Sequence, residues 1–168
     1  ILVEALGPDH PTAARALNER GKGLLLIGRL GEAETGFRAA LEVLRDRLGP
    51  DHPDALGAMT NLAGALAERG AVREAEELAR EGIARTQSAM GADHPALATP
   101  LALLGSLIEG QGDLERAEGL YRRALTLEEA SYPPGHPHIG IARTNLALLL
   151  QARGELAEAE TMLGLTAE

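Results

Sequence analysis

Histidine can act as a general base or a metal ligand, and four histidines of this chain recur at a single spacing. They stand at one constant interval along the chain, at His10, His52, His94 and His136. Packed helices place successive copies about 10 Å apart, so these histidines cannot share one metal ion. We expect Asp or His in each turn to cap the helix that follows, with the next proline in its first turn.

The other reactive residue types do not have the spacing that catalysis requires. His136-Pro137-His138 is the one histidine pair, and the chain has no cysteine to complete a zinc site. The segment Gly21-Lys22-Gly23 falls within a predicted helix and lacks the strand that precedes a phosphate-binding loop. Carboxylates alternate with arginines at helical spacing, which predicts solvated ion pairs. We therefore expect no enzymatic activity, no cofactor and no metal.

The turns that carry the histidines organise the whole chain. The segment Leu48-Gly49-Pro50-Asp51-His52-Pro53 returns in near-copies at 6–11, 90–95 and 132–137. Such a fixed period predicts a solenoid of stacked units. In each unit a glycine ends the first helix and a second helix follows, which predicts a hairpin of two antiparallel helices. These glycines are Gly28, Gly70, Gly112 and Gly154.

This register predicts eight helices and no strand, after a short helical stub within residues 1–6 that ends a preceding repeat. The helices are expected at 11–27, 30–48, 53–69, 72–90, 95–111, 114–131, 137–153 and 156–167. The repeats are expected at about 7–48, 49–90, 91–132 and 133–168, within one domain of residues 1–168. The chain thus starts inside a repeat, and exposed apolar surface is expected at that end.

An apolar stripe along the first helices predicts the core. Its small residues are Gly21, Ala63, Gly105 and Ala147, and a Leu or Ile follows each of them three residues later. Arg20 and Arg143 interrupt the stripe, and we expect both to extend their charge into solvent. Aromatic residues make up 2% of the chain, so the core must consist mainly of Leu and Ala, which favours an all-α fold.

Pro100 departs from the repeat pattern, because it falls five residues into a predicted first helix. In a helix interior a proline costs roughly 3 kcal/mol, since it removes a backbone donor and clashes with the preceding turn. We expect the helix to kink at Pro100 or to begin late at Thr99-Pro100, with Thr99 as the N-cap.

The order of residues in each unit resembles the tetratricopeptide repeat: a small residue, a large one three positions later, a glycine and then an alanine. The 42-residue period and strings such as Leu-Gly-Pro-Asp-His-Pro resemble the kinesin-light-chain type of that repeat. The resemblance covers essentially the whole chain and implies a right-handed superhelical solenoid. The preference for Arg over Lys and the abundance of Ala, Gly and Leu are typical of a bacterial chain.

The resemblance also implies a concave groove that is lined by the first helices and holds an extended or helical peptide. It assigns this role to Arg15, Asn18, Glu19, Lys22, Thr60, Asn61, Gly64, Thr99, Leu103, Ser106, Glu109, Thr144, Asn145, Leu148 and Gln151. Asn61 and Asn145 hold equivalent positions, where an amide can bind a peptide backbone or, alternatively, join neighbouring helices. Cations of the groove occur only in the first repeat, so a clamp for a terminal carboxylate is incomplete.

We therefore expect a non-catalytic module that binds a protein or peptide. The alternative is a structural spacer or self-associating scaffold region of a larger signalling or enzymatic protein. A net charge of -9 and scattered basic residues speak against nucleic acid and against an anionic membrane surface as partners. The apolar runs are far shorter than the ~20 residues that span a bilayer. With no visible signal peptide, the cytoplasm is the default location.

Overall fold

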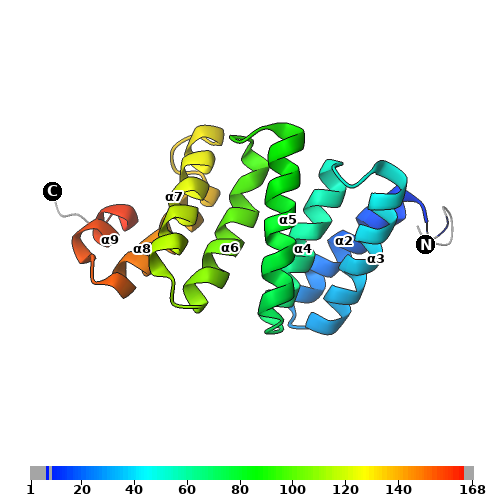
Figure 1. Ribbon diagram of the computed structural model, residues 1–168, viewed down its shortest axis with the longest axis horizontal. Coiled ribbons are helices and arrows are strands. Elements are labelled where there is room, and N and C mark those ends of the chain that lie inside the picture. The colour runs from blue at the N-terminus through cyan, green and yellow to red at the C-terminus, as the bar shows by residue number, and fades with distance from the viewer. Residues whose placement is uncertain (1–6, 8, 165–168) are drawn as a thin grey trace. The chain divides into compact units, whose positions relative to one another are not determined.

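The computed structural model describes residues 7 and 9–164, and its helices follow the predicted hairpin pattern (Figure 1). The elements are α2 (Pro11–Leu26), α3 (Leu30–Leu48), α4 (Pro53–Glu68), α5 (Val72–Met90), η1 (Pro95–Leu97), α6 (Ala98–Gly110), α7 (Leu114–Ser131), α8 (Pro137–Arg153) and α9 (Leu156–Leu163). The described residues contain no strand, so the all-α fold class is confirmed. The stub expected at 1–6 and the end of the last predicted helix lie outside these residues. No helix in the described part of the chain is long and apolar enough to cross a membrane.

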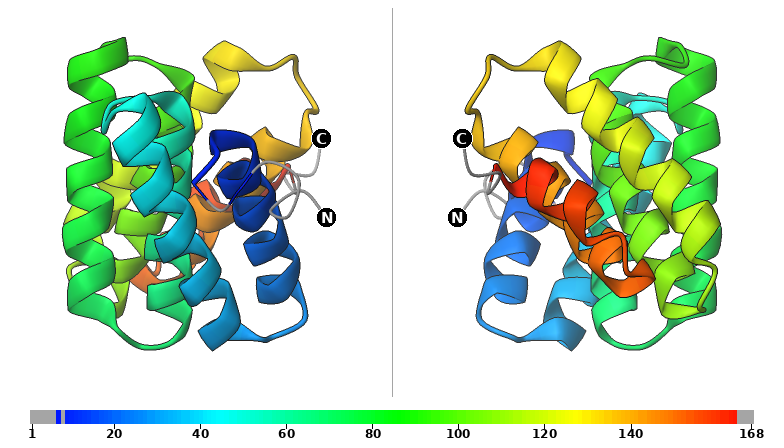
Figure 2. Two further views of the ribbon diagram at one scale, coloured as in Figure 1. Left: turned by 90° about the vertical axis from the view of Figure 1, so that its right-hand side faces the viewer. Right: turned by 90° about the vertical axis from the view of Figure 1, so that its left-hand side faces the viewer.

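The chain forms two compact units, residues 1–89 (unit 1) and residues 90–168 (unit 2). Unit 1 contains the hairpins α2–α3 and α4–α5, and unit 2 contains α6–α7 and α8–α9. In unit 1, α3 packs against both α2 and α4 (Figure 2, left). In unit 2, α7 packs against α6 and α8, and α8 packs against α9 (Figure 2, right). The second helix of one hairpin therefore lies against the first helix of the next within each unit.

Each of the four turns ends in a histidine whose ring caps the following element. Nδ1 of His10, His52, His94 and His136 accepts the backbone N–H two residues later, at 3.1, 3.2, 3.2 and 3.3 Å respectively. A proline occupies the first position of each capped helix or 3-10 turn, where its missing N–H leaves no bond unmade. The expectation that Asp or His caps these helices is confirmed, and histidine is the capping residue.

The glycine at the end of each first helix adopts the left-handed conformation that the register predicts. Gly70, for example, has a φ of 80°. The N–H of Ala71 then reaches back to the carbonyl oxygen of Leu66 at 2.9 Å, which satisfies an acceptor at the end of α4. A residue with a Cβ would be strained at this φ, so the glycine fixes the point at which the chain reverses.

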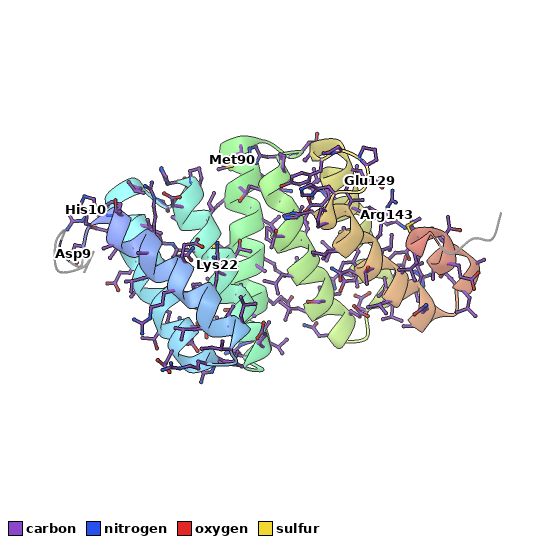
Figure 3. All side chains as sticks on the ribbon, turned by 180° about the vertical axis from the view of Figure 1, so that it is seen from behind. Asp9, His10, Lys22, Met90, Glu129 and Arg143 are labelled. Atoms are coloured by element: carbon purple, nitrogen blue, oxygen red, sulfur yellow. The ribbon has the colours of Figure 1, made fainter. Side chains whose placement is uncertain are left out.

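The apolar stripe lies in the core, as predicted. Its small residues and the larger residues that follow them are all buried, namely Gly21, Leu24, Ala63, Leu66, Gly105, Ile108, Ala147 and Leu150. Arg20 and Arg143 are exposed, as expected. Arg143 on α8 lies beside Glu129 on α7, with Nη2 2.6 Å from Oε1 (Figure 3).

In two hairpins the small residue makes room for an aromatic ring of the second helix. A Cβ on Gly21 would lie 2.5 Å from Cε1 of Phe37, and a Cβ on Gly105 would lie 2.9 Å from Cε1 of Tyr121. Such distances are too short for a real Cβ contact, so each glycine is required by its ring. The other two hairpins carry alanine at the small position, and their residues at the ring position are Ala79 and Leu163.

A network of ion pairs in unit 1 is repeated by the equivalent residues of unit 2. In unit 1, Glu34 on α3 binds Arg38 on its own helix and Arg69 at the end of α4, and Arg38 also reaches Glu74 on α5. The same pattern recurs two repeats later, in unit 2. It consists there of Glu118, Arg122, Arg153 and Glu158. These side chains join the two hairpins of each unit. The pair within one helix also occurs in the repeat between them, where Arg80 binds Glu76.

Helix α6 begins late, as expected, but not at Pro100. The 3-10 turn η1 replaces the first helical turn, and α6 then starts at Ala98 with Leu97 as its N-cap and no side-chain cap bond. Thr99 lies inside the helix, so its assignment as the N-cap is wrong. Pro100 is the third residue of α6, where a backbone N–H would have no partner within the helix, and its missing donor therefore costs little.

Candidate functional site

The recurrent histidines lie at the starts of helices, where their rings act as caps. The Nδ1 atom of each accepts the cap hydrogen bond described above, and a metal ion could not bind this atom without breaking the cap. The described residues also contain no group of three or more His, Asp or Glu side chains that could hold a metal ion. The fifth histidine, His138, is not a cap; its Nδ1 lies 3.6 Å from Oε2 of Glu128.

In unit 1 the predicted groove residues are bonded to one another or to nearby helices. Arg15 on α2 donates to Asp54 on α4, with Nε 2.6 Å from Oδ2. The amide of Asn61 on α4 donates to Oδ1 of Asn18 on α2 at 3.0 Å. Asn61 therefore joins neighbouring first helices, which is the second of the two roles that the sequence left open for it.

Two further groove residues of unit 1 bond within their own helices. Lys22 on α2, labelled in Figure 3, pairs with Glu19 one turn earlier, with Nζ 2.8 Å from Oε1. The hydroxyl of Thr60 on α4 donates to the carbonyl of Leu56 at 3.1 Å. A partner that used these side chains would first have to replace the bonds they already make.

Four predicted residues of unit 2 do not line the pocket that α6, α7 and α8 form in that unit. Glu109 accepts a hydrogen bond from the hydroxyl of Tyr121 at 2.8 Å, and burial together with this carboxylate raises the pKa of Tyr121. The hydroxyl of Thr144 donates to the carbonyl of Gly140 at 2.8 Å. Leu148 and Gln151 are exposed on α8.

The remaining predicted residues of unit 2 meet at a pocket among α6, α7 and α8. The pocket has a volume of about 480 Å³, and Ser106 and Asn145 line it together with Thr99 and Leu103. Most of the lining is apolar. The other lining residues are Ala98, Ala102, Tyr121, Ala124, Glu128, His138, Ile141 and Ala142. A concave, mainly apolar surface with a few polar groups is the usual form of a binding site.

The side-chain amide of Asn145 has no hydrogen-bond partner among the residues that the structure describes. Its equivalent in unit 1, Asn61, binds Asn18. The residue of α6 that corresponds to Asn18 is Ala102, which has no side-chain acceptor. The half-buried amide of Asn145 therefore keeps its donors and its acceptor available within the pocket.

Glu128 on α7 also lines the pocket, and its carboxylate accepts no hydrogen bond in the described part of the chain. Its side chain is only 12% exposed. His138 lies within ion-pair distance, with Nδ1 3.6 Å from Oε2, but donates no hydrogen bond to it. The pocket therefore contains a carboxylate on a mostly covered side chain that accepts no hydrogen bond from the described residues.

The sequence analysis missed the contribution of α7, because it assigned the groove to the first helices alone. Tyr121, Ala124 and Glu128 of this second helix all line the pocket. The repeat register did contain a signal for Glu128. The equivalent positions of the first and second repeats hold Leu44 and Thr86, whose side chains are both buried. A carboxylate at a core position of the repeat marks a departure that packing alone does not explain.

A family model for the tetratricopeptide repeat matches residues 12–88, 58–130 and 97–164. Among solved structures, BtubC (BKLC) from P. vanneervenii has a TM-score of 0.77 at 19% sequence identity. The match covers 92% of this chain and 62% of that chain, so this chain spans less than two thirds of the length of BtubC.

Two structures of kinesin-light-chain-like, nearly identical TPR-like repeats from Podosopora anserina have TM-scores of 0.73 and 0.70 at 23% and 22% identity. Those matches cover 97% and 98% of this chain and 77% and 78% of theirs. These identities establish the fold alone, and no curated protein matches the chain in sequence.

Proposed function

Because the chain belongs to the tetratricopeptide repeat family, we propose that it is a non-catalytic module that binds an extended segment of a partner protein in the pocket of unit 2. Tetratricopeptide repeats generally mediate protein–protein interaction, and the family is generally non-catalytic. The bound segment would lie among α6, α7 and α8, and the side chain of Asn145 on α8 would bond to its backbone.

The free amide of Asn145 is the observation that carries this proposal. A peptide backbone presents one N–H and one C=O per residue, and a single asparagine side chain can bond to both whatever the bound sequence. A bound backbone could use this amide without breaking a hydrogen bond among the described residues, which is not so for Asn61. Ile141 lines the same pocket and is exposed, so an apolar side chain of the partner would cover it.

Peptides selected by the whole chain from a displayed library provide the test. We expect Asn145→Ala to weaken binding of a selected peptide by about 1 kcal/mol, or about fivefold, because a hydrogen bond to the ligand is lost. The melting temperature should stay nearly unchanged, since Asn145 has no hydrogen-bond partner among the described residues. Isothermal titration calorimetry and a thermal melt measure the two quantities.

Asn61→Ala is the matched control. Asn61 holds the equivalent position in unit 1 but bonds to Asn18, so its loss should lower the free energy of unfolding by about 1 kcal/mol. The affinity for the selected peptide should not change. A peptide that binds Asn145→Ala as tightly as the parent chain would contradict the proposed role of the pocket.

Exposed apolar side chains at the end of α2 favour a second candidate function, that of a self-associating scaffold. Leu26 and Ile27 are 89% and 67% exposed, and the same unit has a hollow of about 280 Å³ lined partly by Leu17 and Leu24. Such a scaffold should associate in sedimentation velocity experiments, and the double variant Leu26→Ser with Ile27→Ser should reduce that association. A binding module should keep its peptide after the same change.

A further inference from the structure

We propose that the pocket of unit 2 selects a partner segment with a lysine or arginine side chain, whose cation pairs with Glu128. The methylene groups of that side chain would lie against the apolar lining, near Ala102 and Ala142. This inference rests on the proposed function and adds the chemical class of the residue that the pocket recognises.

The state of Glu128 is the first argument. Its side chain is only 12% exposed, and its carboxylate receives no hydrogen bond in the part of the chain that the structure describes. Burial of a charge without a partner is unfavourable, and the loss is relieved when an opposite charge with N–H donors arrives. The neighbouring Glu129 is different, because it already pairs with Arg143 at 2.6 Å. Among the described residues Glu128 therefore has no lysine or arginine as a partner, and only His138 lies within ion-pair distance.

The arginines of unit 2 cannot supply that cation, which is the second argument. No lysine or arginine lines the pocket. Each arginine in the described part of unit 2 already bonds elsewhere. The partners are Asp113 for Arg116, Glu118 and Glu158 for Arg122, the carbonyl of Ala92 for Arg123, Glu129 for Arg143, and Glu118 and Glu155 for Arg153. The missing cation must therefore come from a partner.

The shape and polarity of the lining are the third argument. Small side chains at Ala98, Ala102 and Ala142 leave room beside Glu128, and they offer only apolar surface. Lysine and arginine suit such a path, because they combine an apolar stem with a charged end. The net charge of -9 adds a long-range attraction for a basic segment.

A positional-scanning library of acetylated and amidated heptapeptides tests the inference. In each sublibrary one position of the peptide holds a single amino acid and the other positions are varied. Binding of each sublibrary to the whole chain is measured by fluorescence anisotropy. We expect a preference for Lys or Arg at one position, and an uncharged norleucine peptide of the same sequence should bind about tenfold more weakly. Glu128→Gln should remove this difference, whereas the control Glu129→Gln should keep it.

Glu128→Leu is a second variant, because it restores the residue type found at the equivalent position, Leu44. Thermal melts should show that both Glu128 variants are at least as stable as the parent chain, since neither removes a hydrogen bond and both remove a charge from a mostly covered side chain. A library that binds without a basic preference, or a preference that survives in the Glu128 variants, would overturn the role of Glu128 and leave the proposed function standing. No binding by any sublibrary would overturn both.

Discussion

At the scale of single residues, one methyl group at Gly21 would disturb the packing of α2 on α3. Alanine is favoured over glycine by about 1 kcal/mol in an exposed helix, but here its Cβ would overlap the buried ring of Phe37. We expect Gly21→Ala to lower the free energy of unfolding by about 1–3 kcal/mol in urea denaturation. Gly23→Ala, in the same helix with open space around it, should raise that free energy by up to about 1 kcal/mol. Stabilisation by both changes would refute the packing explanation.

Tyr121 should make the stability of unit 2 sensitive to alkaline pH. Burial and the bond to Glu109 raise the pKa of Tyr121 above its ordinary value of 10.0. The unfolded chain loses the hydroxyl proton at the ordinary pKa and the folded chain only at higher pH. The stabilisation from this group is therefore complete below about pH 10 and is lost as the pH rises further.

Urea denaturation at about pH 8 and about pH 11 measures this effect. Tyr121→Phe keeps the ring and removes the ionisable group, so its free energy of unfolding should fall less between the two pH values than that of the parent chain. Tyr132→Phe, which leaves Tyr121 and Glu109 in place, should retain the full decrease. An equal decrease in the parent chain and in Tyr121→Phe would exclude Tyr121 as the cause.

The sequence could indicate which positions are equivalent, but not which of them are bonded. Asn61 and Asn145 occupy the same place in the repeat, yet only the structure shows that Asn61 bonds to Asn18 while the corresponding Ala102 leaves Asn145 free. A hydrogen bond depends on the residue at a second position on another helix, and the pattern of one helix does not contain that information. Glu128 was not predicted for a different reason, because it reaches the pocket from α7 and the predicted groove consists of first helices alone.

At the scale of helices, the position of Pro100 changes what its replacement should do. In a helix interior, alanine would restore a hydrogen bond and stabilise the fold. In the first turn of α6 no such bond is available, the proline is buried, and alanine gives the unfolded chain more freedom. We expect Pro100→Ala to lower the free energy of unfolding by about 1 kcal/mol.

Urea denaturation checks this expectation, with Pro95→Ala as the comparison. Pro95 starts η1 and is exposed, so its replacement loses less packing and should cost less. A more stable Pro100→Ala variant would show that α6 gains a turn when the proline is removed.

The helix boundaries could be predicted well because local chemistry determines them. A capping histidine followed by proline starts a helix, and a glycine with positive φ ends one, as at His52 and Gly70. The start of α6 could not be placed from these signals. There the chain forms a 3-10 turn before Ala98, and the choice between 3-10 and α-helical bonding depends on how Leu97 and Pro100 pack in the core.

At the scale of the whole chain, the ion pairs that join hairpins should contribute more than isolated surface pairs. Glu34 binds two arginines, and its side chain is mostly buried. We expect a double-mutant cycle of Glu34→Gln and Arg69→Gln to give a coupling energy of about 0.5–1 kcal/mol. The exposed pair of Arg73 and Glu77 should give a coupling near zero. If the two coupling energies are equal in low salt, the network stabilises the fold no more than an isolated surface pair does.

The pair of Glu34 and Arg69 recurs two repeats later as Glu118 and Arg153, and this spacing determines how the protein could be lengthened by design. Ile27 and Arg69 hold equivalent positions in successive repeats. In tandem copies of the first hairpin alone, an isoleucine would therefore replace the arginine that binds Glu34. Copies of a complete unit would keep Gly21 with Phe37 and Glu34 with Arg69. The module that an engineer should duplicate is therefore a pair of hairpins, although the turns alone suggest a single one.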